Sequence, residues 1–216
     1  MLKIDMHVHT WYSDSDGSVD EVLEVARLKG LDGLAVTDHK TLAGAHEALR
    51  KRGKLIVILG EEITTTQGEI LALGIRKRIP ERLPITDAIR RIHMQGGLAV
   101  VPHPTVPFFS KLRKNPQNHL IDGLEVFSAI TPLSGYFLRK NLELARRLRV
   151  GITAGSDSHS VETVGDAYTI VYSESRDLRD ILQAVRLGNT SVGGGPSKLI
   201  FKLGMIRGLF THLFYG

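Results

Sequence analysis

The chain has 216 residues, enough for one domain with a sizeable core, and its 42% hydrophobic and 24% charged residues are ordinary for a water-soluble globular protein. It contains no cysteine, which excludes disulfides and thiolate metal sites, so any metal must be held by nitrogen and oxygen ligands. The net charge of +5 is compatible with anionic partners such as phosphate esters or nucleic acid.

Apolar strands and amphipathic helices alternate along the chain. The patterns predict strands at 2–8, 33–37, 55–59, 69–75, 98–102, 123–127, 151–155 and 167–172, and helices at 18–29, 41–52, 85–95, 133–149 and 177–187. Ser18 and Thr41 are the expected N-caps. Gly193 to Pro196 is interpreted as a flexible turn. Such alternation favours one domain with a mostly parallel sheet of about seven strands, closed or nearly closed into an α/β barrel.

The first strand ends in Asp5-Met6-His7-Val8-His9. Residues two apart on a strand point to the same face, so the two imidazoles are expected to project together. A pair of imidazoles on one face is a starting point for a transition-metal site. A surface His-x-His that binds nothing has the same spacing, and this motif alone does not decide between the two.

Other strands also run into His, Asp or Glu side chains. The runs are Asp38-His39, Glu61-Glu62, His103 and Asp157-Ser158-His159. The carboxyl ends of the strands are where an α/β barrel keeps its active site. The sequence therefore predicts that these side chains meet at one end of the barrel.

Five motifs, in this order, resemble the PHP (polymerase and histidinol phosphatase) family: Asp5-Met6-His7-Val8-His9-Thr10, Thr37-Asp38-His39, Gly60-Glu61-Glu62, His103-Pro104 and Gly155-Ser156-Asp157-Ser158-His159. The resemblance covers residues 2–195. It implies a distorted (β/α)7 TIM-like barrel with two or three divalent metal ions, Mn²⁺, Fe²⁺ or Zn²⁺. Residues 1–195 would form this PHP metallo-phosphoesterase domain, and the apolar segment 196–216 would pack on the barrel.

The resemblance also implies the activity, which is hydrolysis of phosphate esters by a hydroxide that bridges two metals. Expected substrates are a small phosphorylated metabolite, a nucleotide or an oligonucleotide end. Two alternatives are an amidohydrolase-type C–N hydrolase and a non-catalytic PHP-like subunit that binds RNA. The near-complete set of ligands argues against the RNA-binding subunit, and the lack of a strand-end Lys argues against the amidohydrolase.

The same resemblance assigns metal ligands residue by residue. His7, His9 and Asp157 would hold the first metal, and Glu62 would bridge it to the second, which His103 also binds. Asp14, His39 and His159 would hold a third, with Asp16 as the alternative to Asp14. His39, His159 and Glu62 are the expected catalytic residues. Glu61 points to the opposite side of its strand from Glu62 and is expected to be structural.

Two positions depart from the family pattern. Glu69 stands where many relatives have a His, and an oxygen ligand there would make the second site harder, which favours Mn²⁺ or Fe²⁺ over Zn²⁺. Glu125 replaces a His of some relatives, so either glutamate could complete the second site. Asp5 and Asp38 are each candidates to orient an imidazole or to cap a turn.

A long loop at 103–118 carries the candidates for substrate phosphate, Lys111 and Arg113, beside Phe108 and Phe109. Cations near aromatic rings suit nucleotides. The alternative is that the two phenylalanines fill the barrel mouth below solvated cations. Met1-Leu2-Lys3 leads straight into a strand without a signal peptide, and no transmembrane span is expected, so the predicted location is the cytoplasm.

Overall fold

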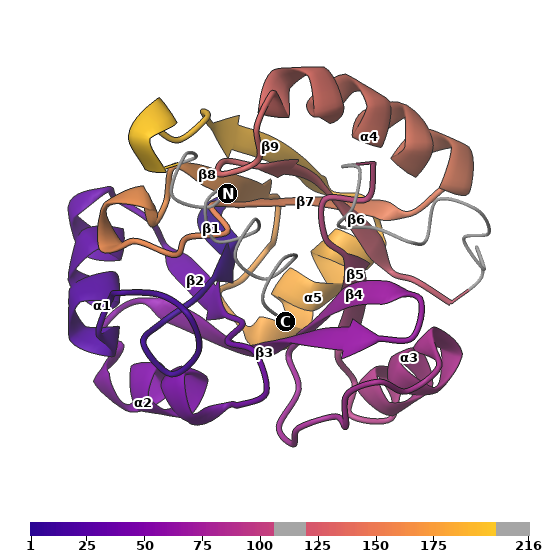
Figure 1. Ribbon diagram of the computed structural model, residues 1–216, viewed down its shortest axis with the longest axis horizontal. Coiled ribbons are helices and arrows are strands. Elements are labelled where there is room, and N and C mark those ends of the chain that lie inside the picture. Colours follow the sequence, from indigo (N-terminus) through magenta and orange to yellow (C-terminus); the bar gives the residue numbers. More distant parts are fainter. Residues whose placement is uncertain (106–119, 202–216) are drawn as a thin grey trace, which may run out of the picture.

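The computed structural model describes residues 1–105 and 120–201. In these residues nine strands form one sheet in the order β7-β6-β5-β4-β3-β2-β1-β8-β9, which curls into a nearly closed barrel (Figure 1). The strands are β1 (Leu2–Val8), β2 (Gly33–Val36), β3 (Ile56–Thr65), β4 (Gly68–Leu73), β5 (Leu98–Val101), β6 (Gly123–Ser128), β7 (Gly151–Gly155), β8 (Ala167–Val171) and β9 (Thr190–Gly194). The helices are α1 (Val19–Leu28), α2 (Ala43–Lys51), α3 (Ile85–His93), α4 (Ser134–Leu148) and α5 (Leu178–Arg186).

The predicted α/β barrel is confirmed, but its sheet is mixed rather than mostly parallel. The pairs β1-β2, β2-β3, β5-β6 and β6-β7 are parallel. The pairs β1-β8, β3-β4, β4-β5 and β8-β9 are antiparallel. β3 and β4 are joined by Thr66 and Gln67 alone, and a connection that short cannot make the crossover that parallel strands require.

Three local predictions differ from the structure. β3 runs on to Thr65, beyond the predicted end at 59, so Glu61 and Glu62 lie inside the strand. Gly193 and Gly194 belong to β9 rather than to a flexible turn. α2 begins at Ala43, so the N-cap residue is Leu42 and Thr41 lies one residue before it. Thr41 Oγ1 still accepts a hydrogen bond from the Ala43 N–H. In each case strand pairing or a local turn, rather than the sequence pattern, determined where the strand or helix begins or ends.

The cap of α1 agrees with the prediction. Ser18 Oγ accepts from the Glu21 N–H, and the Glu21 carboxylate accepts from the Ser18 N–H, which is a complete capping box. This reciprocal pair satisfies backbone donors that the first turn of a helix leaves open. It fixes where the loop that follows β1 ends.

The core has an inner and an outer layer. Inside the barrel, Leu2, Ile4 and Met6 of β1 pack with Leu71, Leu73, Leu98 and Val100, and with Ile181, Leu182, Ala184 and Val185 of α5. α5 therefore plugs the barrel, and Figure 1 shows it lying across the middle of the ring of strands. Helices α1 and α2 cover β1–β3 from outside, α3 covers β4 and β5, and α4 covers β6 and β7. The opposite end of the barrel is left open to side chains from the strand ends.

Side-chain and backbone hydrogen bonds complete the ring between β7 and β1-β8. The Asp157 N–H donates to the His7 carbonyl at 2.8 Å. The buried Thr169 hydroxyl of β8 accepts from the Ala154 N–H at 2.8 Å and donates to the Ala154 carbonyl at 2.9 Å. The Thr169 hydroxyl thus hydrogen-bonds to both the N–H and the carbonyl of Ala154.

Thr169→Val is expected to lower the free energy of unfolding by about 3 kcal/mol, because it keeps the shape and removes both partners of Ala154. The matched control is Thr153→Val, since the buried Thr153 hydroxyl makes no hydrogen bond to the described residues. That variant is expected to be neutral or stabilising. Denaturant unfolding measures both, and equal losses in the two variants would contradict this account of barrel closure.

None of the helices in the described ranges 1–105 and 120–201 combines the length and apolarity needed to cross a membrane.

Candidate metal centre

A bulge in β1 aims both histidines of the first motif into the barrel. Met6 packs in the inner core, whereas Val8 packs outside against α1, so the alternation of the strand reverses between them. The pairing of β1 with β2 shifts register at this point, between Asp5 and Val8. Bulges re-aim side chains in this way. His7 and His9 consequently share the interior face, fully buried, as their spacing predicted.

The two imidazoles face each other and two carboxylates. His7 Nε2 lies 3.0 Å from His9 Nε2, and Glu62 Oε2 lies 3.0 Å from the first and 3.2 Å from the second. Asp157 Oδ1 is 3.5 Å from His7 Nε2 and 3.6 Å from His9 Nε2. Four donor groups from β1, β3 and the end of β7 therefore surround one point.

Glu125 of β6 holds His7 from behind. The His7 Nδ1–H donates to Glu125 Oε1 at 3.1 Å, and the His103 N–H donates to Glu125 Oε2 at 3.2 Å. A carboxylate on Nδ1 fixes the tautomer that leaves the Nε2 lone pair free for a metal. Both oxygens of Glu125 accept these two hydrogen bonds, and Glu125 belongs to none of the groups of side chains that could hold an ion in the described residues.

A second group joins Glu62, Glu69 and His103, whose donor atoms lie within 4.8 Å of one another. Glu62 stands opposite Leu71 and Glu69 opposite Thr64, so the two glutamates are diagonal neighbours on one face of the hairpin. Burial and the charge of Glu62 raise the pKa of Glu69 to about 7. The structure thus brings Glu69, where relatives have a His, to the edge of the same cluster.

A third group is more open and consists of His9, Asp14, His39 and His159. Asp14 lies 3.2 Å from His159 Nε2, 3.5 Å from His9 Nδ1 and 3.6 Å from His39 Nε2. Asp16 lies elsewhere and accepts from the Ser160 hydroxyl and the Val161 N–H. Between the two aspartates that the sequence left open, the geometry brings Asp14 to the histidines.

The cluster has a strongly negative field. Burial lowers the pKa of His7, but the charges of Asp157, Glu62 and Glu125 outweigh it and raise that pKa well above 6.5. The pKa of His9 rises to about 10 for similar reasons, since hydrogen bonds to Asp157 and Glu62 outweigh its burial. Burial raises the pKa of Glu62, yet His7 and His9 hold it well below its usual range. A field that retains protons on imidazoles also attracts divalent cations.

The nitrogen and oxygen atoms of this cluster are better suited to binding a metal ion than to hydrogen bonding with one another. In the described part of the chain, no hydrogen bond reaches the buried Glu62 Oε1. Both Nε2 atoms of the His7–His9 pair point at each other, so one shared proton is all that the contact can use. Imidazole nitrogens and carboxylate oxygens without thiolates suit Mn²⁺, Fe²⁺ or Zn²⁺.

Backbone strain marks two of these positions. His103 has φ 30° and Asp157 has φ 54°, which is uncommon for residues other than glycine. Such conformations persist where the surroundings determine them, and they gather at functional sites. Neither could be read from the sequence.

The neighbouring carboxylates serve the scaffold. Glu61 points away from Glu62, accepting from Arg78 Nε at 3.0 Å and from the Ile79 N–H at 3.1 Å. Asp5 accepts from the His7, Ser156 and Gly165 N–H groups, and burial raises its pKa to about 6. Asp38 accepts from the Thr10 N–H and the Ser13 hydroxyl. Asp5 and Asp38 therefore tie loops together, and within ranges 1–105 and 120–201 neither bonds to an imidazole.

Sequence reasoning missed Ser128, whose hydroxyl donates to Asp157 Oδ2 at 3.3 Å. Its position at the carboxyl end of β6 was the available signal. The predicted phosphate contacts Lys111 and Arg113 lie outside the described residues, as do Phe108 and Phe109 and most of the apolar segment 196–216.

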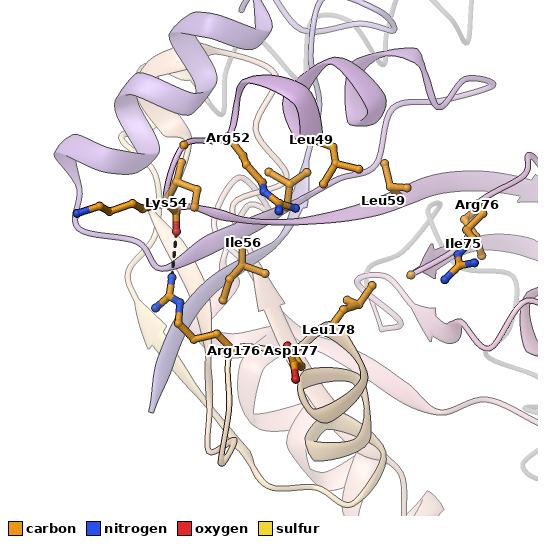
Figure 2. A pocket seen from close by; sticks show the side chains of 14 residues that line it. Leu49, Arg52, Lys54, Ile56, Leu59, Ile75, Arg76, Arg176, Asp177 and Leu178 are labelled. Atoms are coloured by element: carbon orange, nitrogen blue, oxygen red, sulfur yellow. Dashed lines mark hydrogen bonds between the residues drawn. The ribbon is translucent and has the colours of Figure 1, made fainter.

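A cavity of about 470 Å³ opens at the other end of the barrel, where β3 begins (Figure 2). Leu49, Ile56, Leu59 and Leu178 line it together with the cations Arg52, Lys54, Arg76 and Arg176. Arg176 donates to the Lys54 carbonyl at 3.2 Å. The lining of the cavity includes one carboxylate, Asp177, and no histidine. The clustered imidazoles and carboxylates are therefore separate from this cavity.

Comparisons with known proteins agree with this geometry. The family model for the PHP domain matches residues 5–126, and the PHP-associated model matches residues 135–190. An uncharacterized protein of Methanocaldococcus jannaschii is 38% identical over 141 residues, which cover 59% of this chain and 82% of that protein. The phosphoribosyl 1,2-cyclic phosphate 1,2-diphosphodiesterase of Eggerthella lenta is 36% identical over 84 residues, 35% of this chain and 32% of that enzyme.

Solved structures share the fold. A two-domain protein of Bacteroides vulgatus, containing a predicted PHP-like metal-dependent phosphoesterase, matches with a TM-score of 0.74 at 19% identity. The match covers 90% of this chain and 65% of that one, so the chain spans about two thirds of its length. The PHP domain model covers more than half of the sequence and includes most of the clustered side chains. The chain therefore belongs to the PHP domain family.

Proposed function

We propose that this chain is a metal-dependent phosphoesterase acting on a small phosphorylated metabolite, a nucleotide or an oligonucleotide end. The convergence of imidazoles and carboxylates from distant strand ends into three adjoining groups carries the proposal. Family membership and the phosphodiesterase from Eggerthella lenta support the same class of reaction. The mild positive charge of the chain suits an anionic substrate.

The described residues fit more than one divalent ion. His7, His9, Glu62 and Asp157 would hold the first, Glu62, Glu69 and His103 the second, and Asp14, His39 and His159 a third. When bound, such ions lower the pKa of water and neutralise phosphoryl oxygens. Glu69 adds an oxygen donor, which favours Mn²⁺ or Fe²⁺ over Zn²⁺ at the second position.

The protein's own groups orient and move protons. Glu125 keeps the proton of His7 on Nδ1 and directs Nε2 toward Glu62. Burial lowers the pKa of His159, but its hydrogen bond to Asp14 outweighs this and raises the pKa. Where no third ion occupies the Asp14 group, an imidazole that retains its proton near neutral pH and is partly exposed can donate it to a leaving oxygen. His39, on the same open side, is the second candidate for that role.

The test is a substrate panel with Mn²⁺, Zn²⁺ and Mg²⁺. We expect divalent-ion-dependent release of phosphate or alcohol from at least one class among sugar phosphates, nucleotides and short oligonucleotides. Hydrolysis of monoesters alone would define a phosphatase, and shortening of oligonucleotides would define a nuclease. RNA binding without bound metal or hydrolysis would replace the proposal with the non-catalytic subunit, and cleavage of amides alone would replace it with the amidohydrolase.

Asp14→Asn is expected to lower kcat about 10²-fold. The neutral amide no longer stabilises the proton of His159, and the negative charge beside His39 is lost. Asp16→Asn is the matched control in the same loop. It keeps an oxygen for the Val161 N–H, and its kcat is expected to stay within about threefold of the parent. Steady-state kinetics on the best ester compares them, and a larger loss in the Asp16 variant would reverse the assignment.

A further inference from the structure

The loop between His9 and Asp14 presents Trp11, the single tryptophan of the chain, to solvent. Its side chain is 58% exposed, and the neighbouring Tyr12 is 42% exposed. Most large apolar side chains in the described residues are buried in the clusters of the core. Trp11 differs from the other exposed apolar side chains by its position, two residues after His9 and three before Asp14, both of which belong to the cluster.

The backbone of this loop is held firmly, although the indole is not covered. The Trp11 N–H donates to the Gly17 carbonyl at 2.8 Å, and the Ser13 N–H donates to the Thr10 carbonyl at 3.0 Å, which places Trp11 at the corner of a tight turn. The Tyr12 hydroxyl donates to Glu47 of α2 at 2.7 Å. The two rings meet edge-on, with centroids 6.4 Å apart. The turn thus presents a pre-positioned ring.

The open side of the metal centre lies along the same loop. His7 and His9 are fully buried and Glu62 nearly so, whereas the side chains of Asp14, His39 and His159 are 47%, 26% and 32% exposed. Among the described residues, the Asp14 group is therefore the most solvent-exposed part of the cluster. The exposed indole of Trp11 and the exposed carboxylate of Asp14 belong to one short loop, three residues apart.

We propose that Trp11 is a specificity-determining residue that stacks on the flat ring of the substrate, which makes a nucleotide the preferred substrate class over an aliphatic sugar phosphate. This inference rests on the proposed function. A nucleobase has an apolar face and polar edges, and a tryptophan side chain can stack on it whatever the base. A sugar phosphate without a base leaves the indole uncovered and gains nothing from it.

The kinetic test compares adenosine 5′-monophosphate with ribose 5-phosphate, which carries the same phosphate without the base. Trp11→Ala is expected to raise KM for the nucleotide about tenfold, to leave kcat within about twofold, and to leave ribose 5-phosphate unchanged. Trp11→Phe keeps a stacking face and restores most of the affinity. Tyr172→Ala is the control. It removes a ring that is 52% exposed just after β8, away from the motifs, and is expected to leave KM and kcat for both substrates unchanged. Equal effects of Trp11→Ala on both substrates, or none, would overturn the proposal.

A binding test does not depend on turnover. Because Trp11 is the single tryptophan, its fluorescence reports on this position alone. In the metal-loaded protein, with the emission read before appreciable turnover, we expect adenosine 5′-monophosphate to quench the emission and ribose 5-phosphate and inorganic phosphate to leave it unchanged. Unquenched emission at a nucleotide concentration that saturates the enzyme kinetically would overturn the proposal. If no ester is hydrolysed but the nucleotide alone quenches, the stacking site stands and the proposed phosphoesterase function fails.

Discussion

Glu62→Gln is expected to lower kcat by about 10³-fold and to reduce the metal content of the purified protein. Glu62 Oε2 lies 3.0 Å from His7 Nε2 and 3.2 Å from His9 Nε2, and Oε1 lies 3.9 Å from His103 Nε2. The carboxylate is thus common to two of the three groups. Its amide replacement removes one negative charge and turns an N–H₂ toward atoms that must remain acceptors for a cation.

Glu61→Gln is the matched control, because the two glutamates are adjacent on β3 and point to opposite sides. Its amide oxygen can still accept from the Ile79 N–H, so we expect a loss of stability and kcat within about threefold of the parent. Steady-state kinetics and elemental analysis after dialysis measure both variants. Parental turnover and metal content in the Glu62 variant would eliminate it as a bridging residue.

The second large effect concerns protons. Binding of the first divalent ion at neutral pH is expected to release at least one proton from the His7–His9 pair. Asp157 and Glu62 raise the pKa of His7 well above 6.5 and that of His9 to about 10, so the metal-free pair keeps a proton at pH 7. A metal needs the Nε2 lone pairs and must displace that proton.

The sign of the pH dependence follows from the direction of these shifts. A raised imidazole pKa stabilises the metal-free fold below the unfolded value of about 6.5, and this contribution is lost as the pH rises through the raised pKa. Metal affinity changes in the opposite sense, since fewer protons compete. For one displaced proton the apparent Kd should fall about tenfold per pH unit as the pH rises toward the raised pKa of the pair, and should level off above it.

Calorimetry of Zn²⁺ binding in two buffers of different ionisation enthalpy counts the protons directly. Thermal unfolding gives a second readout, because ions at about 1,000 times their Kd add about 4 kcal/mol, or about 10 °C in Tm, and chelation should remove more of this at higher pH. Asp16→Asn should behave like the parent in both assays. A heat of binding independent of buffer, with an affinity independent of pH, would show that the pair holds no proton to release.

The sequence alone predicted the class of fold and most of the side chains that cluster at one end of the barrel. Alternating apolar segments predicted the barrel because strand and helix periods depend on local side-chain order. His39, His103 and His159 were identified as site candidates because parallel strands that share one edge bring their carboxyl ends together. The capping box of α1 was readable because its partners are three residues apart.

Contacts between distant segments decided the remainder. Glu69 reaches Glu62 because β4 returns antiparallel beside β3, which a mostly parallel prediction did not include. The separation of Asp14 from Asp16, and the bond from His7 to Glu125, depend on loops and strands that lie far apart in sequence. The bulge that keeps His7 and His9 inward while Val8 packs outward is a response of β1 to its neighbours. Local periodicity determines which face a residue prefers, but only the packing of all strands around one interior decides which side chains meet there.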